Sequence, residues 1–113
     1  MIRRISGSAP TRSRAVVYNG VVHAVAASPE KTPSVYDQTR LALAVIDRSL
    51  AEAGSDKSRI LTATVFLADM SWKAEMNRAW DEWVARDAAP MRACIGAALE
   101  GEDLVEIIVQ AAV

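Results

Sequence analysis

The sequence predicts an α+β domain, in which one β-sheet carries two helices on the same face. The strand-like and helix-like segments follow one another in the order β-ββ-α-β-α-ββ, which is typical of an α+β layer. An Asn19-Gly20 pair between two β-rich runs indicates a hairpin. No linker or internal repeat divides the 113 residues, so residues 1–113 are expected to form a single domain.

The first part of the chain is expected to hold three strands. A short strand at about 2–6 precedes the hairpin, whose strands span about 14–18 and 21–27. The turn between them is Asn19-Gly20, and both residues tolerate the positive φ that a two-residue hairpin turn requires.

A loop with the sequence SPEKTPS leads into the first helix. Ser34 suits the N-cap position, and Asp37 places a carboxylate near the positive end of the helix dipole. Apolar residues then recur at the i, i+3, i+4 spacing of a helix from Val35 to Ala53. Gly54 follows and is expected to end the helix.

The middle of the chain predicts a strand and a second helix. Residues 59–69 alternate and are rich in β-branched side chains, which is typical of a strand. The helix is expected at about 71–86, with Asp69 or Ser71 as its cap. Pro90 disfavours further helix at this point.

Two final strands, at about 91–99 and 104–112, complete the predicted six-stranded sheet. Both are apolar on both faces, and two helices on one side cannot cover both faces of a sheet. A homo-oligomer that buries the open face is therefore expected.

Composition argues against several classes of protein. A net charge of −1 provides no field that would attract nucleic acid or an anionic membrane. One cysteine excludes an internal disulfide, and with one histidine it cannot form a structural zinc site. No signal-like or membrane-spanning run is evident, so a cytoplasmic location is expected. Phosphate-cradling, metalloprotease and serine-hydrolase motifs are absent, and we expect neither cofactor nor metal.

Arg92 is the first candidate for chemistry, because it interrupts the apolar segment APMRACIGAAL. Strand alternation places it with Cys94 and Gly96 on a face of small residues, which leaves room beside it. A guanidinium beside open space is suited to receive a carboxylate in a bidentate fashion. The alternative is a salt bridge to an acidic residue of a neighbouring strand or subunit.

Three further residues are candidates. Glu106 shares a face with apolar residues of the last strand, where a carboxylate needs a partner. It could hold or deprotonate a water, or it could form an ion pair with Arg92. Cys94 fits either a small buried residue or a thiol whose pKa Arg92 lowers. Asn77 lies beside the apolar stripe of the second helix, as a surface residue or a pocket residue.

Two segments resemble the Rid family of reactive-intermediate deaminases, also called the YjgF family. They are TATVFLADMSWKAEMNRAWDEWV and APMRACIGAALEGEDLVEIIVQAAV, which contain the family's VFL-x-D, P-x-R-x-C and VEI patterns. The segment QTRLALAVIDRSLAEAGSDKSRIL is similar to the family's first helix and the turn after it. The resemblance covers residues 13–113.

The resemblance implies a chorismate-mutase-like homotrimer with sites in the clefts between subunits. It implies an enzyme that needs no cofactor and hydrolyses small 2-imino or enamine acids to 2-keto acids and ammonia. By position, it implies that Arg92 binds the substrate carboxylate and that Cys94 contacts the ligand through its backbone amide. It implies that Glu106 positions the hydrolytic water and that Asn77 lies near the cleft.

The N-terminal half departs from the family pattern. Arg14 stands near the position of a family tyrosine, and Val25 and Ala26 replace a Ser-Gly pair. Ile108 replaces the second glutamate of VEIE. Arg14 and Val25 are still expected to line the part of the pocket that shapes the substrate side chain.

Other functions also fit this sequence. The chain could be a non-catalytic trimer that binds a small carboxylate, or a catabolic deaminase of a bulkier substrate. A ribonuclease function, attached to some relatives, has no electrostatic support from the net charge of −1.

Overall fold

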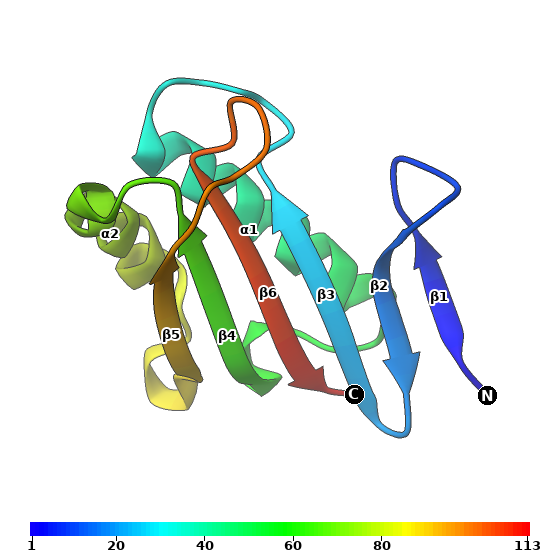
Figure 1. The fold of residues 1–113 in the computed structure, drawn as a ribbon. Helices are drawn as coiled ribbons and strands as arrows, with labels where there is room; N and C mark the ends of the chain where they lie inside the picture. Colours follow the sequence, from blue (N-terminus) through cyan, green and yellow to red (C-terminus); the bar gives the residue numbers. More distant parts are fainter.

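The computed structural model describes residues 1–113 as a six-stranded sheet with two helices on one face (Figure 1). The strands are β1 Arg3–Ser6, β2 Ser13–Tyr18, β3 Val21–Ala27, β4 Ile60–Leu67, β5 Met91–Gly96 and β6 Val105–Ala112. The helices are α1 Val35–Glu52 and α2 Lys73–Trp83, with short 3-10 turns η1 Lys57–Arg59, η2 Met70–Trp72 and η3 Arg86–Ala88. The sheet order is β1-β2-β3-β6-β4-β5, and only β4 and β5 are parallel. The predicted fold class is confirmed.

Local signals determine the hairpin and the first helix as predicted. Asn19 and Gly20 have φ values of 55° and 80°, so both turn residues are in the left-handed region. The Ser34 side chain accepts a hydrogen bond from the Asp37 N–H at 3.1 Å and caps α1. Gly54, with φ of 85°, follows the last turn of α1.

The second helix and the strand after it are shorter than predicted. Asp69 caps η2, not α2, and α2 begins at Lys73 without a side-chain cap. The helix ends at Trp83, because Val84 has extended backbone angles. The fifth strand ends at Gly96 and not near residue 99, because its only neighbour, β4, ends at Leu67.

The core lies between the sheet and the helices. On β6, every second side chain is fully buried beneath the helices, from Val105 to Ala111. The apolar face of α1 packs against these residues through Leu43, Ile46 and Leu50. The strict alternation leaves the intervening side chains of β6, among them Glu106, on the opposite, uncovered face of the sheet.

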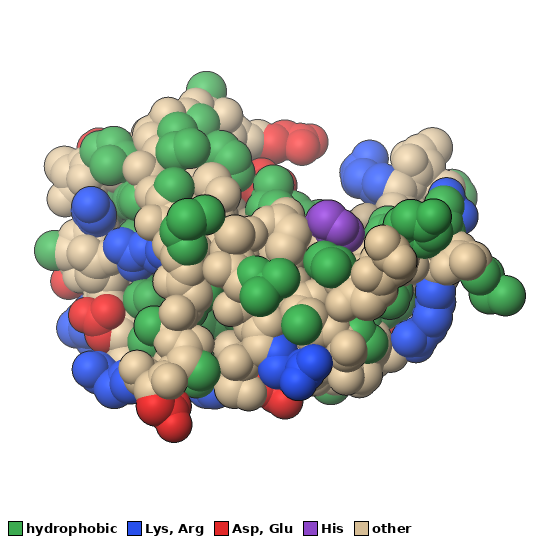
Figure 2. Space-filling view, turned by 90° about the horizontal axis from the view of Figure 1, so that it is seen from below, with side chains coloured by type: hydrophobic (Ala, Val, Ile, Leu, Met, Phe, Trp, Pro, Cys, Tyr) green, Lys and Arg blue, Asp and Glu red, His purple; other side chains and the backbone are tan.

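The uncovered face of the sheet, here called the open face, exposes large hydrophobic side chains. Tyr18 is 56 % exposed, and on β5 Met91 is 73 % and Ile95 is 45 % exposed. Figure 2 shows hydrophobic side chains on both sides of a notch that contains the chain's single histidine. No helix has the length and apolar character needed to cross a membrane.

A bulge in β2 opens a gap in the sheet. Ile5 pairs with Ala15, but Ser6 pairs with Ser13, so that one extra residue, Arg14, is inserted in β2. The pairing of β2 with β3 stops at Ala24. The last residues of β3, from 25 to 27, pair with β6 on one side and have no strand on the other.

Candidate active site

The predicted site residues lie in two separate places. Arg92, Cys94 and Asn77 lie together at the β5 edge of the sheet, beneath α2. Arg14, Val25 and Glu106 line a cavity at the gap between β2 and β3. We call the first place the β5 site and the second the β3 cavity.

In the β5 site, the Arg92 side chain lies on the helix-covered face of the sheet. Its Nη2 donates to Asn77 Oδ1 at 2.9 Å, and its Cζ lies 5.2 Å from the centroid of the Trp80 ring. Nη1 lies 3.7 Å from the sulfur of Met76. Side chains of α2 therefore occupy part of the room that was expected beside Arg92. The guanidinium is half-buried and has no carboxylate partner within the chain.

Cys94 is half-buried and packs against the edge of the core. It pairs with Val65 of β4, and therefore lies on the same face as Arg92 two residues before it. Gly96, the next residue on this face, is covered by the Met70 side chain, since a Cβ at Gly96 would lie 2.9 Å from Met70 Cγ.

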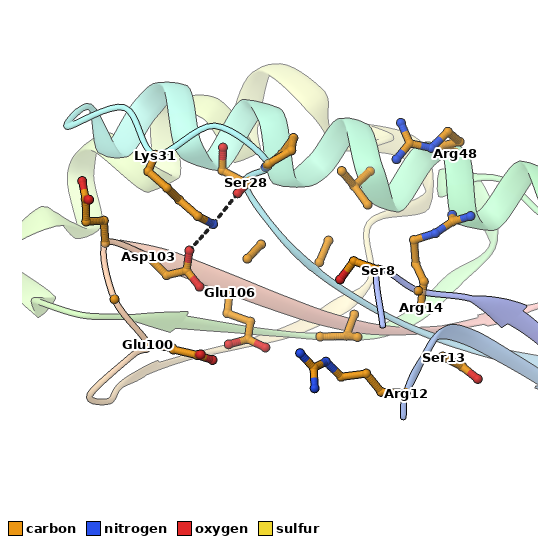
Figure 3. Close-up of a pocket in the computed structure, with 18 residues that line it drawn as sticks. Ser8, Arg12, Ser13, Arg14, Ser28, Lys31, Arg48, Glu100, Asp103 and Glu106 are labelled. Carbon is orange, nitrogen blue, oxygen red and sulfur yellow. Dashed lines mark hydrogen bonds and ion pairs between the residues drawn. The ribbon is translucent and has the colours of Figure 1, made fainter. Parts of the chain in front are cut away.

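The β3 cavity has a volume of about 640 Å³ and is shown in Figure 3. Val25 and Ala26 of β3 form its floor, and Glu106 of β6 lies beside them. Three arginines line it, Arg12 from the β1–β2 loop, Arg14 from β2 and Arg48 from α1. The loop before β6 forms an acidic side, which contains residues 100–103.

Arg14 is held in place by α1. Its Nη1 donates to the buried Ser49 hydroxyl at 2.6 Å, and its Nη2 lies 2.9 Å from a carboxylate oxygen of Glu52. The bulge at Arg14 turns its side chain toward the helix, although a regular alternation would place it on the open face. Arg14 therefore forms one wall of the cavity, with its charge already balanced by Glu52.

Buried Gln38 of α1 fixes the acidic side of the cavity. Its side-chain amide donates to the carbonyls of Thr32 and Glu102 at 2.8 and 3.0 Å. Its Oε1 accepts from the Leu104 N–H at 2.9 Å. Lys31 adds an ion pair to Asp103 across the same two loops. These bonds hold the segment that leads into β6, and therefore Glu106, in one position.

Arg92 and Glu106 face opposite sides of the same sheet. Arg92 pairs with Ala63, which is buried under the helices, whereas Glu106 pairs with Phe66 on the open face. No ion pair joins them, so the alternative of an Arg92–Glu106 salt bridge within one chain is wrong. One chain alone does not bring its predicted carboxylate receptor to its predicted water-binding carboxylate.

The sequence analysis did not identify Arg12, Arg48 or Gln38 as site residues. Arg12 is one of several arginines near the N-terminus, and only the bulge and the loop after β1 bring it to the cavity. Gln38 lies on a helix, and nothing in its spacing shows that it bonds to two loops. No three His, Cys, Asp or Glu side chains converge in a way that could hold a metal ion.

Comparisons with known proteins agree on one family. The family described as "Endoribonuclease L-PSP" matches residues 5–113. A RutC family protein of Haemophilus ducreyi is 47 % identical over 103 residues, which are 89 % of this chain and 88 % of that protein. The RutC family protein YoaB of Escherichia coli is 40 % identical over 102 residues, or 89 % of this chain and 90 % of YoaB.

A solved structure supports the same family. A member of the YjgF protein family from Neisseria meningitidis superposes with a TM-score of 0.93 and is 43 % identical. The superposition covers 99 % of this chain and 94 % of that one.

Proposed function

This chain belongs to the endoribonuclease L-PSP family, which includes the YjgF and RutC proteins, and the resemblance to the Rid (YjgF) family is thereby confirmed. From this membership we propose that it hydrolyses small 2-imino or enamine acids to 2-keto acids and ammonia. The observation that carries the proposal is the Arg92 guanidinium, which is half-buried and has no carboxylate partner of its own.

Arg92 has the role of carboxylate receptor in this proposal. A partly desolvated arginine that makes only neutral contacts, to Asn77 and the Trp80 ring, retains its charge for a ligand. Its planar fork matches the two oxygens of a carboxylate. Asn77 and the Met76 sulfur each contact one terminal nitrogen of Arg92, and the remaining N–H groups of the fork are left for the substrate.

Glu106 orients the attacking water. Water adds to the imine carbon and gives a carbinolamine, its proton passes by way of Glu106 to nitrogen, and loss of ammonia forms the keto group. The overall reaction consumes one imine and one water and yields one 2-keto acid and one ammonia. The Glu106 carboxylate suits this role because it faces the β3 cavity and has no ion-pair partner.

The two halves of the site require a second subunit in this proposal. Arg92 belongs to the β5 edge and Glu106 to the open face, so that another copy has to supply one of them. We propose a homotrimer that buries the open face, where Tyr18, Met91 and Ile95 are exposed in the single chain. Burial of such apolar surface is the main driving force of stable association.

The test follows the decay of 2-iminobutanoate, released in situ by an amino-acid oxidase and trapped by semicarbazide. The wild-type protein is expected to lower the yield of semicarbazone. Glu106→Gln is expected to reduce this activity about 100-fold or more, since a positioned base contributes about that much. Arg92→Ala is expected to reduce it about 10- to 100-fold, the contribution of a charged hydrogen-bonded pair.

Arg40→Gln is the control, because Arg40 is an exposed arginine of α1 outside the β3 cavity and the β5 site. If the wild-type protein leaves the lifetime of the imine unchanged, the deaminase proposal is wrong. Stabilisation by 2-ketobutyrate in thermal denaturation without turnover would instead support a non-catalytic carboxylate-binding trimer.

A further inference from the structure

Two arginines of the β3 cavity have no part in the proposed reaction. Arg12 lies in the β1–β2 loop and Arg48 on α1, and both are exposed to the cavity. Neither belongs to any of the ion pairs in the chain. The other two cations of the cavity are neutralised, Arg14 by Glu52 and Lys31 by Asp103. Arg12 and Arg48 are therefore the two cations of the cavity that have no ion-pair partner, and the lining carboxylates without one are Glu100, Glu102 and Glu106.

Arg12 lies on the same side of the cavity as Glu106. Figure 3 shows its side chain extending along the open-face side of the sheet toward Glu106, whereas Arg14 and Arg48 lie next to α1. The Arg12 guanidinium and the Glu106 carboxylate do not form an ion pair. A molecule between them would therefore meet a carboxylate at one end and a cation at the other.

A 2-imino acid next to Glu106 would have its imine nitrogen near the carboxylate and its side chain within reach of Arg12. If Arg92 of another copy binds the α-carboxylate, Arg12 is free to bind a charged group at the end of that side chain. The cavity, at about 640 Å³, is in the size range of small-molecule sites and exceeds what a short alkyl side chain fills. An alkyl group there would also leave the Arg12 guanidinium without a partner.

We propose that this cavity selects 2-imino acids with a second, distal carboxylate, and that Arg12 recognises it. This inference rests on the proposed function and names the substrate class of the same site. Arg12 is the specificity-determining residue, because it is the unpaired cation on the Glu106 side of the cavity.

The experiment compares two imines, 2-iminobutanoate and 2-iminoglutarate, both generated in situ by oxidases. The quantity measured is the ratio of kcat/KM for the dicarboxylic over the monocarboxylic imine. For wild type this ratio is expected to be about 10 or more, since a charge-assisted pair contributes at least that factor. Arg12→Gln is expected to bring the ratio close to one, and Arg12→Lys to retain part of it. Arg40→Gln, the matched exposed arginine, is expected to retain the full ratio.

Two results would overturn the inference without affecting the deaminase proposal. In the first, wild type hydrolyses both imines with equal kcat/KM. In the second, Arg12→Gln lowers kcat/KM for both imines by the same factor, which would make Arg12 a partner of Glu106 or of the single α-carboxylate.

If neither imine is hydrolysed, the proposed function fails, and direct binding decides the present inference. Calorimetric titration with 2-ketoglutarate and 2-ketobutyrate then measures the two affinities. Tighter binding of the dicarboxylate by wild type, lost in Arg12→Gln, supports an anion site at Arg12. Equal affinities, or a preference that survives in Arg12→Gln, contradict it.

Discussion

At the scale of single residues, two uncharged neighbours hold the Arg92 guanidinium in place. Asn77 Oδ1 accepts a hydrogen bond from Nη2 of Arg92 at 2.9 Å, and the Trp80 ring lies against the guanidinium. Neither neighbour carries a charge, so both restrict the orientation of the side chain without neutralising it. Asn77 was predicted to lie near the cleft, and its contact with Arg92 gives it the role of a positioning residue in the proposed site.

Asn77→Asp tests this arrangement. The new carboxylate would lie about 3 Å from the guanidinium and form an ion pair with it, in competition with the substrate carboxylate. The KM for 2-iminobutanoate is expected to rise about 10-fold, while the folded protein becomes no less stable to urea. Asn77→Ala, which removes the contact without adding charge, is expected to raise KM less. A KM for Asn77→Asp at or below that of Asn77→Ala would show that Arg92 does not bind the carboxylate.

At the scale of elements, local chemistry made part of the fold predictable. The Asn19-Gly20 turn and the two ends of α1 depend on residues within a few positions of one another, and all three were predicted. The bulge at Arg14 depends on the pairing of β2 with β1, and the end of β5 at Gly96 depends on its pairing with β4. The sequence around Arg14 and Gly96 contains no information about which strand lies beside each of them.

The same limit applies to the candidate site. Alternation placed Arg92 with Cys94 and Glu106 with Ile108, and the register agrees with both pairs. The sequence could not show whether Arg92 and Glu106 lie on the same face of the sheet. That depends on the strand order β6-β4-β5 and on the position of α2, which alternation does not reveal. The β3 cavity depends on loops whose contacts, such as those of Gln38, are distant in sequence.

Asp69, between β4 and α2, is expected to make the stability of the fold depend on pH. Hydrogen bonds from the Ser71 hydroxyl and from the Ser71 N–H, the latter at 2.9 Å, lower the pKa of this exposed carboxyl. A carboxyl whose pKa is lower in the folded state than in the unfolded state stabilises the fold above its unfolded pKa, about 4. That stabilisation is lost as the pH falls through the folded value.

Asp69→Asn retains an oxygen acceptor but does not titrate. We expect this variant to be less stable than wild type at pH 7, and the difference to disappear as the pH falls below about 4. Urea denaturation at a series of pH values measures it. A difference that stays constant down to pH 3 would show that the charge of Asp69 does not stabilise the turn.

At the scale of the whole molecule, the sheet divides the candidate site between two faces. The β5 site lies beneath α2, while Glu106 opens toward the uncovered face. The proposed trimer would close that face and join the two parts across each interface. This arrangement makes activity a property of the assembly, because each subunit contributes half of two different sites.

Mixed trimers test this arrangement. Arg92→Ala and Glu106→Gln are each expected to retain at most about a tenth of wild-type activity alone. In a co-refolded equal mixture, about one quarter of the interfaces would combine an intact Arg92 with an intact Glu106. The mixture is therefore expected to regain about one quarter of wild-type activity in the imine-decay assay. If the mixture remains as inactive as its parents after subunit exchange, both residues of a site come from one chain.

The gap beside β3 lies next to Val25 and Ala26, the two residues that replace the family's Ser-Gly pair. Along 25–27, the edge of β3 that faces the cavity has no strand to bond to. Its free peptide N–H and C=O groups are available to a ligand, and such groups are the same whatever side chain the residue carries. Val25 and Ala26 therefore change the shape of the cavity floor and leave its main-chain donors and acceptors in place. In the proposed site, side-chain changes at this floor would therefore alter which substrate fits without altering the main-chain groups that face it.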